Sequence, residues 1–196
     1  MYNFLNDIPD KSEYKNTTSL KFKKELCDFF KDKNLKCCVE FGTNKGHSAR
    51  VLSYLFEEIF TFDIKNENIE FSKKLNFDRT NITHFVTDVY NSDLTVYLND
   101  VYVDCFFIDC VHEYGNVLYD IKNAKFLSNL NKDKKIYLVF DDYSHPTSTG
   151  VRKAIDKATV DFSLSFERFL GQEKGYSFNP ETTLIGPEGI ILSFKN

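Results

Sequence analysis

The chain has 196 residues, of which 42% are hydrophobic and 28% charged, a composition typical of one globular domain with a buried core. Its 25 basic and 29 acidic side chains give a formal net charge of −4, which argues against nucleic acid as a partner. The sequence shows neither a signal peptide nor an apolar run near the ~20 residues of a membrane span, and its five cysteines form no CxxC pair, so we expect a cytoplasmic protein without disulfides, cysteine-bound zinc or a membrane partner.

Helix and strand patterns alternate along the chain. A first helix is expected at about 17–33, where Phe22, Leu26 and Phe30 recur on one helical face. The apolar run 37–41 follows and ends at Gly42, which predicts a buried strand. The alternation then predicts strands at 59–63, 82–86, 103–109 and 135–141, and helices near 46–57, 66–75, 114–129 and 149–159, with one more short helix between 86 and 103.

These patterns predict a fold class. Apolar strands with little alternation are typical of a parallel sheet covered on both faces, and strand–helix–strand order gives right-handed crossovers. The sequence therefore predicts an α/β fold with a doubly wound sheet. The runs 162–166 and 189–194 have no helix between them, so we expect an antiparallel pair there. We interpret the chain as a single domain, 1–196, with a helical extension at 1–35, a core at 36–160 and a β-hairpin region at 161–196.

The loop 40–48 follows the first predicted strand. Ligands of such sheets bind beyond the carboxyl ends of the strands, where chain order reverses. Gly42 allows a sharp turn and a close ligand approach, and Gly46 opens the next helix where a side chain would obstruct the ligand. The loop does not have the GxGxxG spacing of a dinucleotide site, and an ordinary turn is the alternative reading of the two glycines.

Three carboxylates accompany this loop. Asp63 closes the next strand, about 20 positions after Gly42, where an acidic side chain accepts hydrogen bonds from ribose hydroxyls. Glu40 lies at the end of the first strand and suits a cationic ligand rather than a diphosphate. Together they predict an adenosine ligand with positive charge, such as S-adenosylmethionine (SAM). Asp88, after the third strand, is placed either to bind an adenine amino group or to cap a turn.

A second group of carboxylates, Asp109, Asp141 and Asp142, ends the fourth and fifth strands. Adjacent parallel strands lie about 4.8 Å apart, so these side chains should meet at one rim of the sheet. Like charges in such a group raise each other's pKa, and Mg²⁺ would relieve the repulsion. The alternative is that one or two of these aspartates cap helices or bind loop amides.

Histidines lie near this rim. His112 follows Asp109 by three residues, and its imidazole could accept a proton from a hydroxyl nucleophile or bond to a neighbouring loop. His145 lies on the next rim loop, whereas His84 lies inside a strand and is interpreted as structural. Cys110 is interpreted as a small residue beside the site rather than as a nucleophile.

Four segments in order, 39–48, 108–114, 140–143 and 150–154, resemble class I SAM-dependent methyltransferases. The resemblance covers about 36–160 and is greatest to small-molecule O-methyltransferases related to macrocin and catechol O-methyltransferases, with cephalosporin-hydroxylase-like proteins as neighbours. It implies a Rossmann-like, seven-stranded sheet that is mostly parallel with an antiparallel C-terminal strand.

The resemblance also implies roles for single residues. Asp63 would hold the ribose of SAM and Asp88 would lie near adenine. Asp109, Asp141 and Asp142 correspond to ligands of Mg²⁺ or another divalent cation, and His112 would act with Asp109 in catalysis. The cofactor-binding residues implied in this way are Glu40, Gly42, Thr43, Gly46, Ser48, Asp63, Asp88 and Asp109. The chain departs from the family at Cys110, where glycine or alanine is common, and in its short N-terminal extension.

The function implied is methyl transfer from SAM to a hydroxyl oxygen of a sugar-like or phenolic small molecule. A metal would lower the pKa of the acceptor oxygen, while His112 or a ligand aspartate removes its proton. One alternative is a cofactor-binding partner or scaffold without catalysis. Another is a nicotinamide-dependent oxidoreductase, which the loop sequence disfavours. A protein acceptor and a homo-oligomer stay open.

Overall fold

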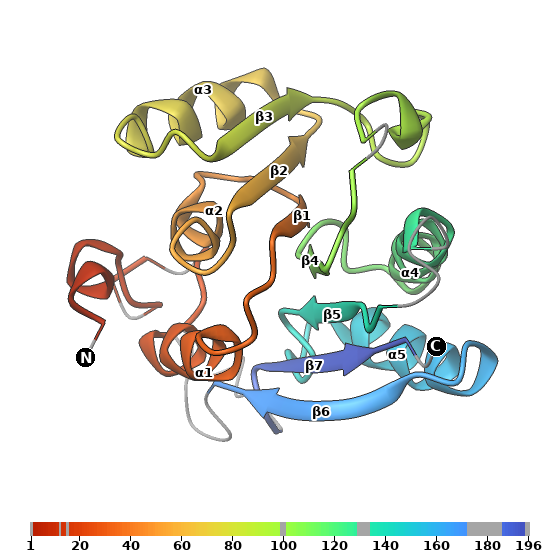
Figure 1. The fold of residues 1–196 in the computed structure, drawn as a ribbon. Helices are drawn as coiled ribbons and strands as arrows, with labels where there is room; N and C mark the ends of the chain where they lie inside the picture. The colour runs from red at the N-terminus through yellow and green to blue at the C-terminus, as the bar shows by residue number, and fades with distance from the viewer. Residues whose placement is uncertain are drawn as a thin grey trace.

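The computed structural model describes residues 2–11, 13–14, 16–98, 101–128, 134–171 and 186–194. Its centre is a seven-stranded sheet formed by β1 Cys37–Phe41, β2 Glu58–Asp63, β3 Ile82–Val86, β4 Cys105–Ile108, β5 Tyr137–Phe140, β6 Ser165–Leu170 and β7 Gly189–Ser193. The strand order is β3-β2-β1-β4-β5-β7-β6, and β7 lies antiparallel between β5 and β6 (Figure 1). The other neighbouring pairs are parallel. The predicted doubly wound sheet with an antiparallel C-terminal strand is confirmed.

Helices cover both faces of the sheet. Figure 1 shows α1, α2 and α3 on one side and α4 and α5 on the other. Their bounds are α1 Leu20–Phe30, α2 His47–Leu52, α3 Asn66–Leu75, α4 Tyr114–Ser128 and α5 Thr149–Asp161, with short 3-10 helices at Asn3–Asp7 and Leu94–Val96. The N-cap of α1 is Ser19, whose Oγ accepts a hydrogen bond from the backbone N–H of Phe22 at 3.1 Å. Residue 129, the end of the helix predicted at 114–129, lies outside the described residues.

The two sheet faces bury separate hydrophobic clusters. Alternate residues of one strand belong to different clusters: Cys38 packs with α1 and α2, while Val39 and Phe41 pack with α4 and α5. All five residues of β1 are buried, as are those of β4, β5 and β7. Burial on both faces explains why these strands show no polar alternation in the sequence.

Several predicted elements have different bounds in the structure. The helix expected at 149–159 continues to Asp161, and the strand expected at 162–166 is Ser165–Leu170. Phe162 donates its backbone N–H to the carbonyl of Ala158 at 2.9 Å, and Ser163 has φ +52°, so these residues end the helix. The helix expected at 46–57 ends at Leu52.

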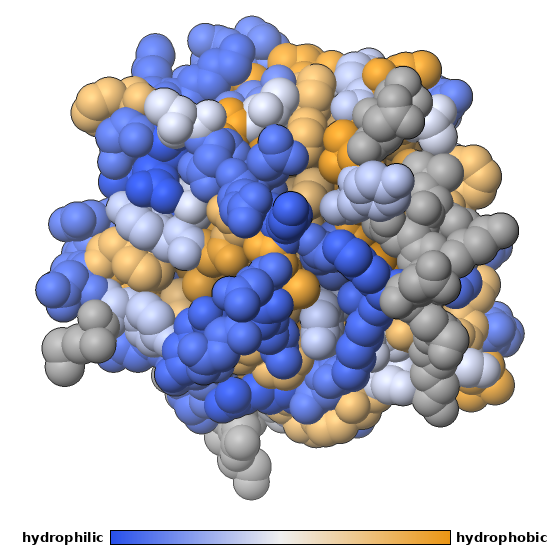
Figure 2. All heavy atoms as spheres, in the orientation of Figure 1, coloured by the Kyte–Doolittle hydropathy of each residue, from blue (hydrophilic) through white to orange (hydrophobic). Residues whose placement is uncertain are grey.

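The surface is mixed. On the face shown in Figure 2, hydrophilic residues occupy much of the middle, and hydrophobic residues are visible in patches between them. Exposed apolar side chains such as Phe77 and Val160 come from different parts of the chain, as is usual for folded domains. Among the described residues, no helix combines the length and apolar character needed to cross a membrane.

Candidate functional site

A cavity of about 350 Å³ lies at the carboxyl ends of β1 to β4. This is the point where chain order reverses, because β1 has β2 on one side and β4 on the other. The volume lies within the range of small-molecule sites. The cavity is lined by Gly42, Asn44, Phe62, Asp63, Ile64, Lys65, Thr87, Asp88, Val89, Tyr90, Cys110 and Val111.

Gly42 forms the turn directly after the end of β1. Its φ is +95°, a conformation that L side chains rarely adopt, and its N–H bonds to the carbonyl of Phe62 at 3.0 Å. A Cβ at this position would lie 2.0 Å from the backbone oxygen of Asp109 and 3.2 Å from the Cα of Cys110. The loop after β4 therefore packs directly on the Gly42 backbone, where only glycine fits.

Asp63 lies at the end of β2 and lines the cavity. Its carboxylate accepts hydrogen bonds from the backbone N–H groups of Asn44 at 2.9 Å and Lys65 at 2.8 Å, and from Asn68 Nδ2 at 3.0 Å. A carboxylate can accept about four hydrogen bonds, so capacity remains for a ligand hydroxyl. Asp63 thus links the loop after β1 to the start of α3. The same hydrogen bonds fix the orientation of its carboxylate.

Asp88 lines the same cavity beyond β3. Its carboxylate accepts hydrogen bonds from Asn91 Nδ2 at 2.7 Å and from the backbone N–H of Tyr90 at 2.9 Å, which lower its pKa. Asp88 therefore caps the turn after β3, which is the second of the two roles that the sequence left open. The same side chain is also exposed to the cavity.

Glu40, Thr43 and Ser48 do not line the cavity but lie beside it. Glu40 is fully buried and accepts a hydrogen bond from Thr61 Oγ1 at 2.5 Å; Thr61 in turn lies 2.6 Å from Thr43 Oγ1. Burial raises the pKa of Glu40 to about 8. Glu40 Oε1 has no hydrogen-bond partner among the described residues. This carboxylate is therefore costly to ionise in the free chain and could pair with a cationic ligand group.

Gly46, predicted to leave room for the ligand, allows close packing of two helices in the structure. It is the N-cap of α2 with φ +79°, and a Cβ there would lie 2.0 Å from Ser72 Oγ and 2.8 Å from Asn76 Nδ2. The space is filled by α3 side chains rather than left for a ligand. Asn76 also donates to the Gly46 carbonyl at 3.1 Å, so Gly46 allows α2 and α3 to pack closely.

We call Asp109, Asp141 and Asp142 the acidic rim. His112 lies between two of these aspartates. His112 Nε2 lies 3.1 Å from Asp109 Oδ1, and Nδ1 lies 3.5 Å from Asp142 Oδ2. The hydrogen bond with Asp109 raises the pKa of His112 to about 9, against the opposing effect of burial. At neutral pH the imidazole is therefore a cation that bridges two carboxylates from different strands.

The rest of the rim carries a second cation. Lys11, from the N-terminal segment, places Nζ 3.7 Å from Asp142 Oδ1 and 3.3 Å from Glu188 Oε1. Burial lowers the pKa of Lys11, but the charges of Asp141, Glu188 and Asp142 outweigh it and raise that pKa. Asp141 is buried, which together with the charge of Asp142 raises the pKa of its carboxyl group well above the usual range.

The three rim aspartates do not form a metal site in this arrangement. Among the described residues, no three His, Cys, Asp or Glu side chains are grouped as metal ligands. Asp109 is turned toward His112, and Asp142 is shared between His112 and Lys11. The predicted convergence of the aspartates occurs, but two cationic side chains lie among the carboxylates.

The remaining histidines lie outside this bridge. His84 Nε2 bonds to Ser72 Oγ at 2.9 Å, in keeping with a structural role. His47 is half-buried against the ring of Tyr14, and burial lowers its pKa to about 4. His145 lines a second cavity of about 280 Å³, next to Asp142 in the sequence. This cavity is lined by Tyr143, Ser144, His145, Pro146, Thr149, Arg152, Lys153 and Asp156.

The structure thus divides the predicted residues into groups. Gly42, Asp63 and Asp88 line the first cavity, and Asp109, His112, Asp141 and Asp142 lie around the rim. Sequence reasoning missed the apolar wall of the cavity, including Ile64, Tyr90 and Val111. Their position within two or three residues of a predicted strand end could have indicated them. Sequence reasoning also missed Lys11 and Glu188, for which the sequence offers no signal.

A family model described as a methyltransferase domain matches residues 39–143. This span runs from β1 to just past β5 and includes both the first cavity and the rim. A search of curated proteins found no match.

Solved structures share the fold at low sequence identity. The O-methyltransferase of Bacillus cereus, in complex with SAH, has a TM-score of 0.67 at 15% identity, over 99% of this chain and 87% of that chain. The O-methyltransferase TomG of Streptomyces achromogenes, involved in tomaymycin synthesis and in complex with SAM, has a TM-score of 0.63 at 15% identity, over 91% and 81%. The tRNA (m1A58) methyltransferase TrmI of Aquifex aeolicus has a TM-score of 0.57 at 18% identity, over 92% and 71%.

Proposed function

Since the chain belongs to the methyltransferase-domain family, we propose that it transfers the methyl group of SAM to a hydroxyl oxygen of a small molecule. One observation carries the proposal: the family match coincides with a cavity at the switch point of the sheet that has Asp63 and Asp88 in its wall. SAM, when bound, supplies a methyl group activated by a sulfonium. The side chains of this chain would hold the adenosine and orient the acceptor.

The cofactor end of the proposal rests on three features. Asp63 has hydrogen-bonding capacity left for the ribose, and the apolar wall of the cavity suits the faces of adenine. Glu40 offers a buried carboxylate with one unpartnered oxygen for the cationic end of the ligand. Asp88 would exchange or share its bond to Asn91 when an adenine amino group is present.

The acceptor end of the proposal rests on the rim. His112 is the group placed to take the proton of an acceptor hydroxyl, since it lies on the loop after β4 and among the rim carboxylates. The two cations among the rim carboxylates, Lys11 and His112, favour an acceptor without a positive charge. Arg152 and Lys153 in the second cavity favour the same class.

Magnesium assistance was expected from the rim aspartates. The residues present do not fit a metal as they stand, because His112 and Lys11 occupy the carboxylates that would bind it. No step of the proposed reaction is therefore assigned to a metal.

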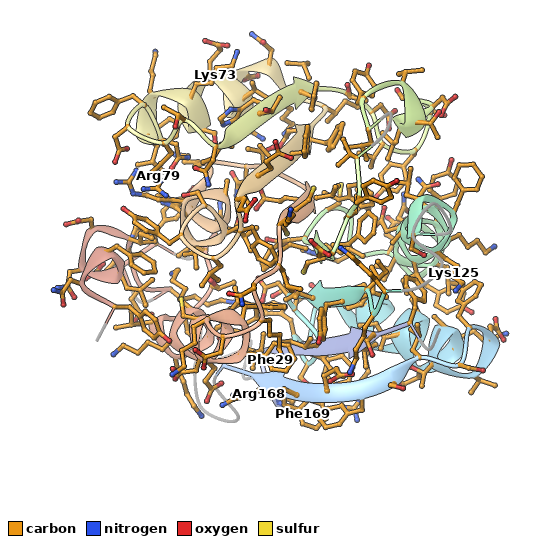
Figure 3. The ribbon with its side chains drawn as sticks, in the orientation of Figure 1. Phe29, Lys73, Arg79, Lys125, Arg168 and Phe169 are labelled. Carbon is orange, nitrogen blue, oxygen red and sulfur yellow. The ribbon has the colours of Figure 1, made fainter. Side chains whose placement is uncertain are left out.

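A small-molecule acceptor is also favoured by the distribution of charge. The labelled cations in Figure 3, Lys73, Arg79, Lys125 and Arg168, lie at separate places around the molecule rather than in one stripe. A nucleic-acid acceptor would favour a continuous basic surface, and the net charge of this chain is −4.

Calorimetric titration with SAM and SAH tests the cofactor. We expect both to bind the wild-type chain, and Asp63→Asn to weaken binding by about 10- to 100-fold, because hydrogen bonds to a charged group contribute about 1.5–3 kcal/mol. Asp93→Asn is a matched control, since Asp93 also accepts a backbone N–H, that of Thr95, but does not line the cavity. Equal affinity in wild type and Asp63→Asn would contradict the ribose role.

A panel of phenolic and sugar hydroxyl acceptors with labelled SAM tests the reaction. Turnover with one of them supports the proposal. Binding of SAM without turnover over the whole panel would favour a non-catalytic partner or scaffold, and binding of a nicotinamide cofactor in place of SAM would favour an oxidoreductase.

The rate of methyl transfer should depend on the protonation of His112. Because its pKa is raised to about 9, the neutral imidazole that can accept a proton is a minor form at pH 7. The rate is expected to rise with pH up to about 9 and then level off, and His112→Gln should lose this rise together with about 10²- to 10⁴-fold in rate. The measurement is a pH–rate profile of both proteins with an acceptor from the panel. An unchanged profile in His112→Gln would remove this residue from the reaction.

A further inference from the structure

We propose that the ammonium of Lys11 occupies the cation position at the acidic rim, so that this chain positions its acceptor without a divalent metal. The proposal rests on the proposed function, because it concerns the acceptor side of the same site. Lys11 is assigned as a positioning residue, which acts through Asp142 and thereby on His112.

The N-terminal segment holds Lys11 in place from several directions. Asp10, its neighbour, accepts backbone hydrogen bonds at its carbonyl from Glu13 and Tyr14, both at 2.9 Å. The Asp10 carboxylate accepts one from Leu20 N at 2.6 Å, and Lys23 Nζ donates to the carbonyl of Pro9 at 2.7 Å. The backbone just before Lys11 is therefore tied to the start of α1, and the residues after it turn back onto Asp10.

The side chain of Lys11 reaches into the acidic rim from this anchored turn. Only 13% of it is exposed, and Nζ lies between carboxylates of two different segments, Asp142 after β5 and Glu188 before β7. The side chain of Glu188 is fully buried and that of Asp142 is 15% exposed. Carboxylates held this far from water require a nearby positive charge.

An ammonium and a divalent cation cannot share this place. Mg²⁺ binds carboxylate oxygens at about 2.0–2.1 Å and requires near-octahedral geometry, so it would have to approach Asp142 within a few ångströms of Nζ. Repulsion between the two cations in a poorly solvated setting opposes this. His112 holds the other oxygen of Asp142, at 3.5 Å, so both sides of the carboxylate are engaged.

The consequence for the reaction is a fixed positive charge where a metal would otherwise lie. Lys11 Nζ lies beside one oxygen of Asp142 and His112 beside the other, and His112 is held between Asp142 and Asp109. The bridge from the N-terminal segment through the rim to the loop after β4 would then orient the imidazole toward the acceptor.

Titration with Mn²⁺, followed by its paramagnetic resonance signal, tests the proposal without an acceptor. We expect no saturable binding by the wild-type chain up to millimolar Mn²⁺. Lys11→Met should gain one saturable site that fills roughly tenfold or more below the highest Mn²⁺ concentration tested, because Asp142 and Glu188 lose the ammonium between them. Lys11→Arg keeps the charge and should stay like wild type. A lysine with only a structural role would not change metal binding in this way.

Controls and a second variant complete the test. Lys31→Met removes an exposed lysine paired with Asp28 at 3.2 Å and should leave Mn²⁺ binding unchanged. If Lys11→Met does not fold, Lys11→Gln, which keeps a hydrogen-bond donor, takes its place and is expected to gain the same site. Stoichiometric Mn²⁺ binding by wild type that Asp142→Asn abolishes would overturn the proposal, as would a folded Lys11→Met or Lys11→Gln without Mn²⁺ binding. SAM binding is measured separately, so a failure here is distinct from a failure of the proposed function.

Discussion

Replacing Gly42 with alanine is expected to abolish SAM binding and to lower the free energy of unfolding by about 3 kcal/mol or more. Two independent costs add. The backbone has φ +95°, which strains any L side chain, and the new Cβ would lie 2.0 Å from the carbonyl oxygen of Asp109. The atoms it meets are backbone atoms at 2.0, 2.8 and 3.2 Å, so a side-chain rotation cannot relieve the overlap. The loop carrying Cys110 must move, and that loop is part of the cavity wall.

Gly115→Ala provides the matched control. Gly115 lies in the first turn of α4, and a Cβ there meets nothing within 4 Å. Alanine should leave SAM affinity unchanged and stabilise the helix by about 0.5–1 kcal/mol. Urea unfolding followed by circular dichroism, together with calorimetry, measures both variants. A Gly42→Ala protein with wild-type affinity for SAM would show that the cofactor does not use this cavity.

Glu188→Ala is expected to lower the free energy of unfolding by about 3–5 kcal/mol, the range for breaking a buried charge pair. The side chain of Glu188 is fully buried and accepts hydrogen bonds from Ser19 N at 2.9 Å, Ser19 Oγ at 2.5 Å and Lys11 Nζ at 3.3 Å. Alanine would leave the α1 N-cap without these contacts and the Lys11 ammonium with fewer opposing charges. The effect should therefore reach both the start of α1 and the acidic rim.

Thermal and urea unfolding measure this loss. Glu70→Ala is the control, because Glu70 also pairs with a lysine, Lys73 at 3.0 Å, but does so on the exposed surface of α3. Its stability should be close to that of wild type, since exposed pairs contribute little. Glu188→Gln, which keeps an oxygen acceptor, should lose less than Glu188→Ala. Equal stability of Glu188→Ala and Glu70→Ala would contradict the structural importance of the buried pair.

The central strands of the fold could be predicted from the sequence because their burial leaves a clear pattern. The run 37–41 is apolar throughout and stops at Gly42, so its bounds were predicted correctly. The edge strand β6 was placed three residues early, because Phe162 and Leu164 alternate with serines as a strand would. The competing helix cap at Phe162 depends on backbone hydrogen bonds that no local pattern specifies.

The site was predictable where its residues follow strands. Asp63 and Asp88 could be placed at the rim of the sheet because parallel strands end on one side. Lys11 could not, since it reaches Asp142 and Glu188 from the other end of the chain by contacts that leave no periodicity. The packing role of Gly46 could not be predicted either, because it depends on the position of Ser72 in another helix.

The position of β7 sets an order of assembly for the sheet. β6 comes earlier in the chain, yet it joins the sheet only through β7, which follows it and separates it from β5. Residues before β7 can therefore complete the cavity, whose lining ends at Val111, while Glu188, one of the two carboxylate partners of Lys11, is still missing. A chain interrupted before Glu188 would contain the complete first cavity beside an open sheet edge, with Lys11 lacking its buried partner, so the first cavity and the contacts of Lys11 become complete at different stages of synthesis.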